Sequence, residues 1–245
     1  MDFDGHQRVL FVHAHPDDET LSTGIAIARL APSGRAGVLT ATRGERGEVV
    51  PGPLKPLEGS AALAAHRERE LAEALHALGH PWHAWLGEPP ARAAGLPPRR
   101  YQDSGMRWAA PGLAAAAGDA APDAFSLAPF EEVVGDVLAA IGAFDASLVV
   151  SYDAGGGYGH PDHVRAHEAA RAAAGRAGLP FWERAEDGDR IVADDGIAAQ
   201  LRQALAAHAS QLTLDGTELV LSGGQRRPIP RREGYRARRG AESLN

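Results

Sequence analysis

Two short apolar runs each lead directly into a segment rich in histidine and aspartate. Residues 9–12 (VLFV) precede residues 13–19 (HAHPDDE), and residues 147–150 (SLVV) lie shortly before residues 158–163 (YGHPDH). Each run has the length and composition of a buried strand, and the polar residues after it indicate a loop. The carboxyl ends of parallel strands meet at one edge of a sheet, so we expect the two loops to face each other across one crevice.

Strand and helix patterns alternate along the rest of the chain. This alternation predicts an α/β fold, Rossmann-like, with a mostly parallel sheet flanked by helices. Ser60 and Gly79 bracket the clearest helix, because serine favours helix starts and glycine favours helix ends. The predicted strands cover residues 8–14, 36–42, 82–86, 147–152 and 181–183, and the predicted helices cover residues 21–30, 61–78, 130–141, 162–177 and 196–209.

Two stretches do not follow this alternation. Residues 87–126 are rich in Pro, Gly and Ala and show little periodicity, so we expect a lid or binding loop. Residues 1–210 are predicted to form the main domain, and residues 211–245 a small C-terminal extension that packs on or near the site. Within the extension, the Arg-dense residues 226–239 are expected to form a solvated tail.

The composition narrows the class of protein. The chain has 245 residues, 44% of them hydrophobic, which is enough for one sizeable core. Its net charge of -7 and the lack of a basic stripe disfavour nucleic-acid binding. No apolar stretch approaches the roughly 20 residues that cross a bilayer, and we find no signal-peptide pattern. We therefore expect a cytoplasmic protein with no membrane partner.

The two polar loops carry the side chains of a metal site. The chain has no cysteine, so any metal must be held by His, Asp or Glu. His15 and Asp18 are three residues apart across a strand-to-helix turn and can reach one ion, and His163 can reach it from the opposite loop. Three such ligands leave a position for water, as in catalytic zinc sites, and iron(II) is the alternative metal.

Two further side chains of these loops are left free for chemistry. Asp17 lies beside the metal ligands as a base for the bound water, and His160 lies three residues before His163. Each of these groups alone is typical of a helix cap or a surface residue. A dinucleotide site is disfavoured, because the first turn carries carboxylates and residues 155–157 (GGG) lack the G-x-G-x-x-G spacing. Together the two loops indicate a metal-dependent hydrolase.

The two motifs resemble the signature segments of the PIG-L-like (LmbE-like) zinc N-deacetylases, and the resemblance runs over about residues 9–211. It implies a zinc enzyme that hydrolyses the acetyl group of a small-molecule amino sugar. Within the family the chain is similar to the mycothiol-pathway deacetylases, which act on N-acetylglucosaminyl-inositol. Smaller matches occur at residues 44–49, 66–71, 103–106, 158 and 208–211.

The resemblance also implies roles at the reacting bond. His15, Asp18 and His163 are the expected zinc ligands, and Asp17 is the expected general base. His160, expected to be protonated, would stabilise the oxyanion. The remaining expected catalytic residues are Tyr158, which would polarise the acetyl carbonyl, and Asp162, which would orient an imidazole.

Three residues are implied in binding the sugar or inositol hydroxyls. They are Arg67, Asp103 and Glu48. For Arg67 the sequence leaves an alternative open, because residues 67–70 (RERE) form a charged run that is typical of a solvated helix face.

Alternatives to this substrate remain. Ser22 favours an N-acetyl substrate over the mycothiol conjugate amidase, which tends to carry Lys there. The segment of residues 179–195 is shorter than the corresponding segment of the mycothiol-pathway members. This leaves open a paralogue that deacetylates another amino sugar or an aminocyclitol glycoside of natural-product biosynthesis. A non-catalytic sugar-binding module is the third alternative, and it would not need Asp17 or His160. A homo-oligomer is also left open.

Overall fold

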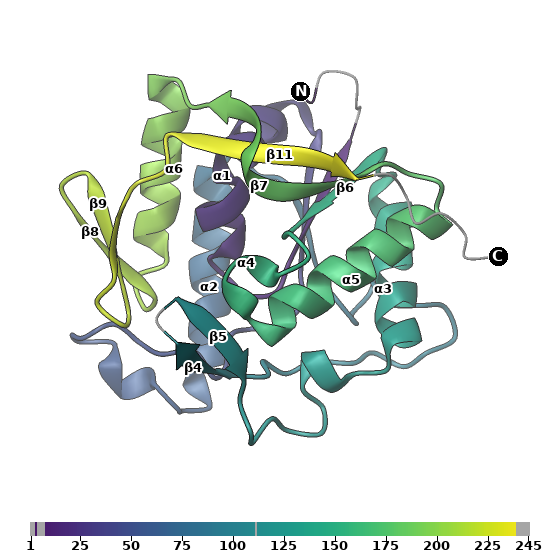
Figure 1. Cartoon of the computed structure of the whole chain (residues 1–245), viewed down its shortest axis with the longest axis horizontal. Coiled ribbons are helices and arrows are strands. Elements are labelled where there is room, and N and C mark those ends of the chain that lie inside the picture. Colours follow the sequence, from purple (N-terminus) through teal and green to yellow (C-terminus); the bar gives the residue numbers. More distant parts are fainter. Residues whose placement is uncertain (1–2, 4–7, 111, 239–245) are drawn as a thin grey trace.

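A six-stranded sheet forms the centre of the computed structural model, which describes residues 3, 8–110 and 112–238 (Figure 1). The strand order is β11-β7-β6-β1-β2-β3, and β11 alone runs antiparallel to its neighbour. The mostly parallel α/β fold is therefore confirmed. The strands are β1 (Val9–His13), β2 (Ala36–Thr40), β3 (Trp82–Trp85), β6 (Leu148–Ser151), β7 (Phe181–Val192) and β11 (Arg232–Arg238).

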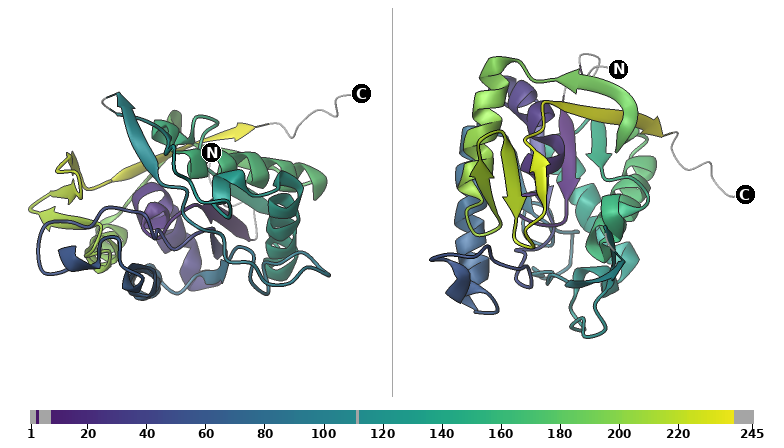
Figure 2. Two further views of the ribbon diagram at one scale, coloured as in Figure 1. Left: turned by 90° about the horizontal axis from the view of Figure 1, so that it is seen from below. Right: turned by 60° about the vertical axis from the view of Figure 1, so that its left-hand side comes forward.

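Helices cover both faces of this sheet (Figure 2). The alternation of side chains along β1 explains why both faces need a cover: Val9 and Phe11 lie in one buried cluster, and Leu10 and Val12 lie in the other. Helices α1 (Asp18–Leu30), α2 (Ala62–Ala77) and α6 (Asp195–Ala207) pack on the first cluster, and α3 (Phe130–Phe144) and α5 (Pro161–Arg176) pack on the second. Shorter elements are η1 (Ala31–Ser33), η2 (Lys55–Leu57), η3 (Phe125–Leu127) and α4 (Gly156–Gly159).

The chain order reverses between β1 and β6. These two strands are direct neighbours, with Val9 opposite Leu148 and Phe11 opposite Val150, whereas β2 and β7 lie on their outer sides. In open α/β sheets such a reversal leaves a crevice at the carboxyl ends of the two strands. The loops that carry both sequence motifs start at these ends, as we expected from the two apolar runs.

The stretch at residues 87–126 contains a hairpin of β4 (Met106–Ala110) and β5 (Leu113–Ala116). The hairpin packs on the second motif: a Cβ at Gly159 would lie 2.8 Å from the carbonyl oxygen of Ala114. The stretch therefore reaches the rim of the crevice, and its action as a lid stays a prediction.

The C-terminal segment contains the hairpin expected after residue 211, but it differs from the solvated tail expected for residues 226–239. Strands β8 (Leu212–Asp215), β9 (Glu218–Leu221) and β10 (Arg226–Pro228) form a small antiparallel sheet, and β11 then joins the main sheet. The reason is β7, which is 12 residues long instead of the predicted three and offers β11 a long edge. Arg236 and Arg238 pair there with buried Glu183, so the expectation of a solvated tail is wrong for β11. Arg239 lies outside the described residues, and the predicted boundary at residue 210 stays a prediction.

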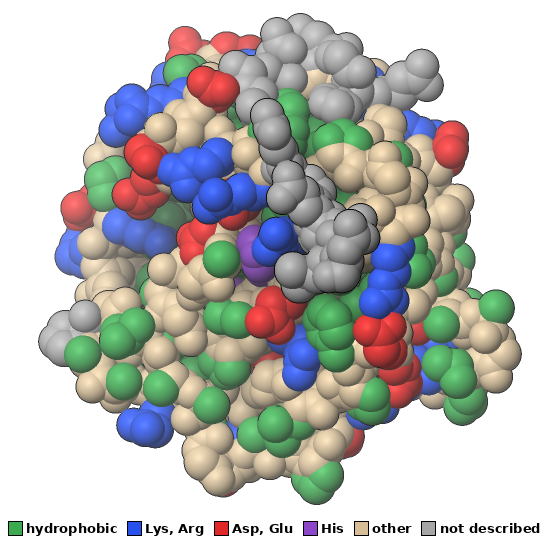
Figure 3. Space-filling model, turned by 45° about the vertical axis from the view of Figure 1, so that its right-hand side comes forward, with side chains coloured by type: hydrophobic (Ala, Val, Ile, Leu, Met, Phe, Trp, Pro, Cys, Tyr) green, Lys and Arg blue, Asp and Glu red, His purple; other side chains and the backbone are tan. Residues whose placement is uncertain are grey.

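Acidic and basic side chains are intermixed over the face drawn in Figure 3. Among the described residues, no helix combines the length and apolar character that a membrane span needs.

Candidate metal centre

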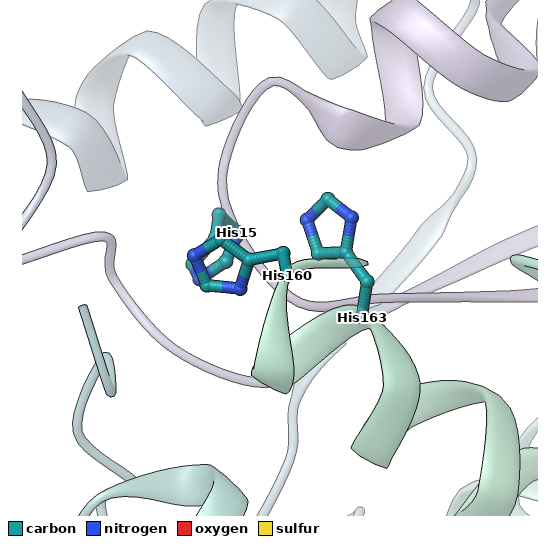
Figure 4. Close-up of side chains that lie close together, drawn as sticks. All are labelled: His15, His160 and His163. Atoms are coloured by element: carbon teal, nitrogen blue, oxygen red, sulfur yellow. The ribbon is translucent and has the colours of Figure 1, made fainter. Parts of the chain in front are cut away.

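Three predicted ligands meet at the carboxyl end of β1. His15 follows β1, and His163 lies in the first turn of α5 (Figure 4). Asp18 begins α1. Asp18 Oδ2 lies 3.3 Å from His15 Nδ1 and 3.3 Å from His163 Nε2, and all three residues are buried. One carboxylate oxygen thus faces a nitrogen of each imidazole, which brings together the donor set that the sequence predicted.

The far nitrogen of each imidazole has its own partner. His163 Nδ1 lies 3.2 Å from the carbonyl oxygen of Gly156, and His15 Nε2 lies 3.2 Å from Asp162 Oδ2. Histidines that bind metals are oriented in this way by a carbonyl or carboxylate behind the ring. His163 Nε2 is buried and has no hydrogen-bond partner in the described part of the chain, as a nitrogen prepared for a cation would be. The donor set therefore fits a divalent metal.

Other groupings of donors lie within reach of one ion. The ligand atoms of His15, His160 and His163 lie within 4.8 Å of one another, and so do those of His15, Asp103, His160 and Asp162. In both groupings some donors already have partners. Asp162 accepts hydrogen bonds from the backbone N–H and the hydroxyl of Ser104, and His160 Nδ1 accepts one from the backbone N–H of Asp162. Asp18 Oδ2 also accepts one, from the backbone N–H of His15, but it faces the unpartnered Nε2 of His163 at 3.3 Å. For this reason we favour His15, Asp18 and His163.

The adjacent carboxyl groups of Asp17 and Asp18 have opposite pKa shifts. Burial alone would raise the pKa of Asp18, but His163 and His15 outweigh it and lower this pKa well below its usual range. Burial and the charge of Asp18 raise the pKa of Asp17 to about 7. Neighbouring carboxyl groups with diverging pKa values are typical of sites where one group stays ionised and the other exchanges protons.

His160 differs from the sequence-based expectation of a protonated ring. Burial, together with His15 and His163, lowers the pKa of His160 to about 3. Because Nδ1 accepts a hydrogen bond from the backbone N–H of Asp162 at 3.2 Å, the proton of the neutral ring lies on Nε2. This environment therefore disfavours the imidazolium that the resemblance implied for His160 and places a neutral hydrogen-bond donor at the start of α5.

Tyr158 lies at the mouth of the site. Its ring is 39% exposed and lies 5.2 Å from the ring of His163 and 6.0 Å from that of His160, between centroids. The ring of Trp108, in the β4–β5 hairpin, lies 5.8 Å from that of Tyr158 between centroids. The phenol is thus placed between the metal-site histidines and the rim.

The three predicted substrate-binding residues are placed differently from one another. Asp103 is buried beside the site, with Oδ1 at 3.6 Å from His15 Nε2. Arg67 is buried and donates hydrogen bonds to the carbonyls of Gly44 and Glu48, so it orders that loop. The Glu48 side chain is exposed and accepts a hydrogen bond from Ser222 at 3.3 Å. It lines a surface hollow of about 460 Å³ together with Glu45, Arg46, Gly47, Glu58 and Gly59.

Comparison with known proteins assigns the chain to a family. The model of the PIG-L family, described as GlcNAc-PI de-N-acetylase, matches residues 10–174. The chain belongs to the PIG-L family. The match contains both metal-site loops, and it confirms the resemblance that the motifs indicated.

Two similar proteins in this family share one name. A protein from Actinosynnema mirum, named 1D-myo-inositol 2-acetamido-2-deoxy-alpha-D-glucopyranoside deacetylase, is 35% identical over 93% of this chain and 90% of its own length. A protein of the same name from Kineococcus radiotolerans is 49% identical over 68% of this chain. The chain spans about half the length of that relative and of one from Saccharopolyspora erythraea, with 44% and 54% covered.

Solved structures support the PIG-L fold. The N,N'-diacetylchitobiose deacetylase of Pyrococcus horikoshii has a TM-score of 0.63 at 18% identity, covering 97% of this chain and 86% of its own. The zinc inhibited form of a teicoplanin deacetylase has a TM-score of 0.59 at 24% identity, covering 83% of this chain and 84% of its own. At these identities the likeness concerns the fold.

Sequence reasoning missed two residues that hold the PIG-L site together. Tyr152 stacks on His163 with ring centroids 4.1 Å apart, and its hydroxyl accepts a hydrogen bond from the backbone N–H of Ala14 at 2.8 Å. Ser104 donates to Asp162 from both its N–H and its hydroxyl. Tyr152 directly follows the apolar run of β6, and this position was the available signal. Ser104 lies within the family match at residues 103–106, but that match did not indicate its contact with Asp162.

Proposed function

We propose that this PIG-L family member is a metal-dependent hydrolase that removes the acetyl group of N-acetylglucosaminyl-inositol, as in mycothiol biosynthesis. Water and the amide would give acetate and the free amine. The proposal is carried by Asp17, a carboxyl group with a raised pKa, next to the donor set of His15, Asp18 and His163. The names of the relatives support the substrate.

The metal would be held by His15, Asp18 and His163. Two histidines and one carboxylate suit zinc, and they also suit iron(II). When bound, such an ion lowers the pKa of its water and polarises a carbonyl oxygen.

Asp17 would do the proton transfer. Its raised pKa lets the carboxylate take a proton from the attacking water and return it to the leaving amine, because a base works best with a pKa close to the working pH. Its side chain makes no capping hydrogen bond to α1, so the carboxylate is not committed to the helix.

His160 and Tyr158 would stabilise the oxyanion. The Nε2–H of neutral His160 and the hydroxyl of Tyr158 are hydrogen-bond donors on rings that lie beside the metal ligands His15 and His163. A neutral imidazole at a helix start can polarise a carbonyl without carrying charge. Asp162 would keep the ring of His15 in place from behind.

Recognition of the sugar and inositol hydroxyls would fall first to Asp103. Arg67 would act mainly by holding residues 44–48, since its guanidinium already bonds two carbonyls there. Glu48 would contact the substrate from the exposed side of this loop. We further propose a cytoplasmic location, in line with a small-molecule biosynthetic role.

The experiment is an assay of free-amine release by the purified, zinc-loaded protein. N-acetylglucosaminyl-inositol, N-acetylglucosamine and a mycothiol conjugate are offered at equal concentration. Preference for the inositol glycoside supports the proposal, and preference for the conjugate indicates the amidase. No release from any of the three, with zinc bound, contradicts the proposed substrate and favours another acetylated amino sugar or a sugar-binding module.

A further inference from the structure

A buried chain of side chains reaches from the end of α6 to the backbone of Asp17. His208, which follows α6, has Nε2 at 2.9 Å from Glu19 Oε1 and 3.3 Å from Thr20 Oγ1. The other carboxylate oxygen, Glu19 Oε2, accepts a hydrogen bond from the backbone N–H of Asp17 at 2.9 Å. Glu19, Thr20 and His208 are at most 1% exposed.

Asp17 needs such a support because its backbone is strained. Its φ of 112° lies in the region that favours glycine, and its ψ is -30°. A non-glycine residue keeps this conformation only where the surroundings hold it there, and such residues occur often at active sites. The carbonyl of Asp17 accepts hydrogen bonds from the N–H groups of Thr20 and Leu21, at 3.1 and 2.8 Å, and Glu19 holds its N–H.

Different groups hold the backbone carbonyl and the backbone N–H of Asp17. The backbone of α1 holds the carbonyl through the N–H groups of Thr20 and Leu21, whereas the N–H of Asp17 is held by the side chain of Glu19. Glu19 in turn has its remaining oxygen bonded to His208 and Thr20. A buried carboxylate stays in place only when its partners do, so loss of His208 would loosen the contact to Asp17.

We propose that Glu19 and His208 are positioning residues, which hold Asp17 in the strained backbone conformation needed for its work as the base. The inference rests on the proposed function of Asp17. It assigns a role to His208 and to Glu19 that neither metal binding nor substrate contact requires. It also makes the segment after α6 part of the active site, although that segment lies about 190 residues from the first motif.

The test compares Glu19→Gln, His208→Ala and His208→Gln, with N-acetylglucosaminyl-inositol as substrate. We expect Glu19→Gln and His208→Ala to lower kcat by about 100-fold, since displacement of a catalytic group by about 1 Å has such an effect. KM should stay within about twofold, and the metal content, measured by elemental analysis, should be unchanged. His208→Gln keeps an N–H donor for Glu19 and should recover most of kcat.

Glu233→Gln is the matched control. Glu233 is also a buried carboxylate that accepts hydrogen bonds from α1, from the N–H groups of Ile25 and Ala26, but it has no contact with Asp17. The kcat of the Glu233→Gln variant should stay at the wild-type value. If Glu19→Gln does not fold, His208→Ala and His208→Gln carry the comparison.

Two results separate failure of this inference from failure of the proposed function. Wild-type kcat in Glu19→Gln or His208→Ala, with Asp17→Asn inactive, would overturn the positioning role alone. Loss of metal from these variants, or no recovery in His208→Gln, would also overturn it. Full activity in Asp17→Asn would instead overturn the proposed function.

Discussion

Asp17 and Asp18 show how one backbone turn separates two carboxyl groups with different tasks. Asp18 contacts both histidines, and its pKa is lowered by them, whereas the pKa of Asp17 is raised to about 7. We expect Asp17→Asn to lower kcat by about 10²- to 10⁴-fold, the range for loss of a general base. Elemental analysis should show wild-type metal content, and kcat within tenfold of wild type would remove Asp17 from the mechanism.

His163 should instead be required for the metal. Its Nε2 is buried without a hydrogen-bond partner in the described structure and faces Asp18 Oδ2 at 3.3 Å, so removal of the ring takes away a metal ligand. We expect His163→Ala to bind less than about one tenth of the wild-type metal, because the substitution removes one of only three protein ligands. His167→Ala, at a buried histidine in the same helix that bonds the carbonyl of Tyr152, is the control and should keep the metal.

At the scale of elements, the sequence predicted the strands whose formation depends on their own residues. The two apolar runs predicted β1 and β6 and the meeting of their loops, because burial on both faces of a parallel sheet leaves a continuous apolar run. The length of β7 and the strand β11 depend on each other across about 50 residues, and the polar sequence of residues 183–190 gave no sign of it. The neutral state of His160 depends on rings that only the fold brings together. The contact between His208 and Glu19 was hidden for the same reason.

The loop between β2 and α2 depends on glycines that make room for Arg67. A Cβ at Gly47 would lie 2.2 Å from Nη1 of Arg67 and 2.8 Å from Nη2, and hydrogen bonds hold that guanidinium in place. Gly47→Ala should therefore lower the free energy of unfolding by about 1–3 kcal/mol, as overpacking does. Gly118→Ala is the reference for chemical denaturation, because a Cβ added at Gly118 would have no contact within 4 Å. Equal stability of the two variants would show that Arg67 is free to move.

At the scale of the whole molecule, Glu233 joins β11 to α1 through hydrogen bonds to Ile25 at 2.7 Å and Ala26 at 3.1 Å. Burial raises the pKa of Glu233 above 4.5. The folded protein therefore keeps this proton at pH values where the unfolded chain has lost it. The free energy of unfolding should fall as pH rises above 4.5, by at most about 1.4 kcal/mol per pH unit. Denaturation curves of Glu233→Gln should lack this slope, and an identical slope in both proteins would assign it to other groups.

Strand β11 also bears on whether residues 1–210 can fold without the rest of the chain. In β11, Tyr235 is 2% exposed and lies 5.1 Å from the ring of Phe3, and Glu233 is equally buried against α1. A chain that ends at residue 210 loses this strand and exposes the edge of β7, where buried Trp182 and Glu183 then face water. We expect that chain to be insoluble or to lack a cooperative thermal transition, whereas a chain that ends at Arg238 should melt like the full protein. A cooperative transition and wild-type metal content in the shorter chain would instead show that residues 211–245 are a separable extension.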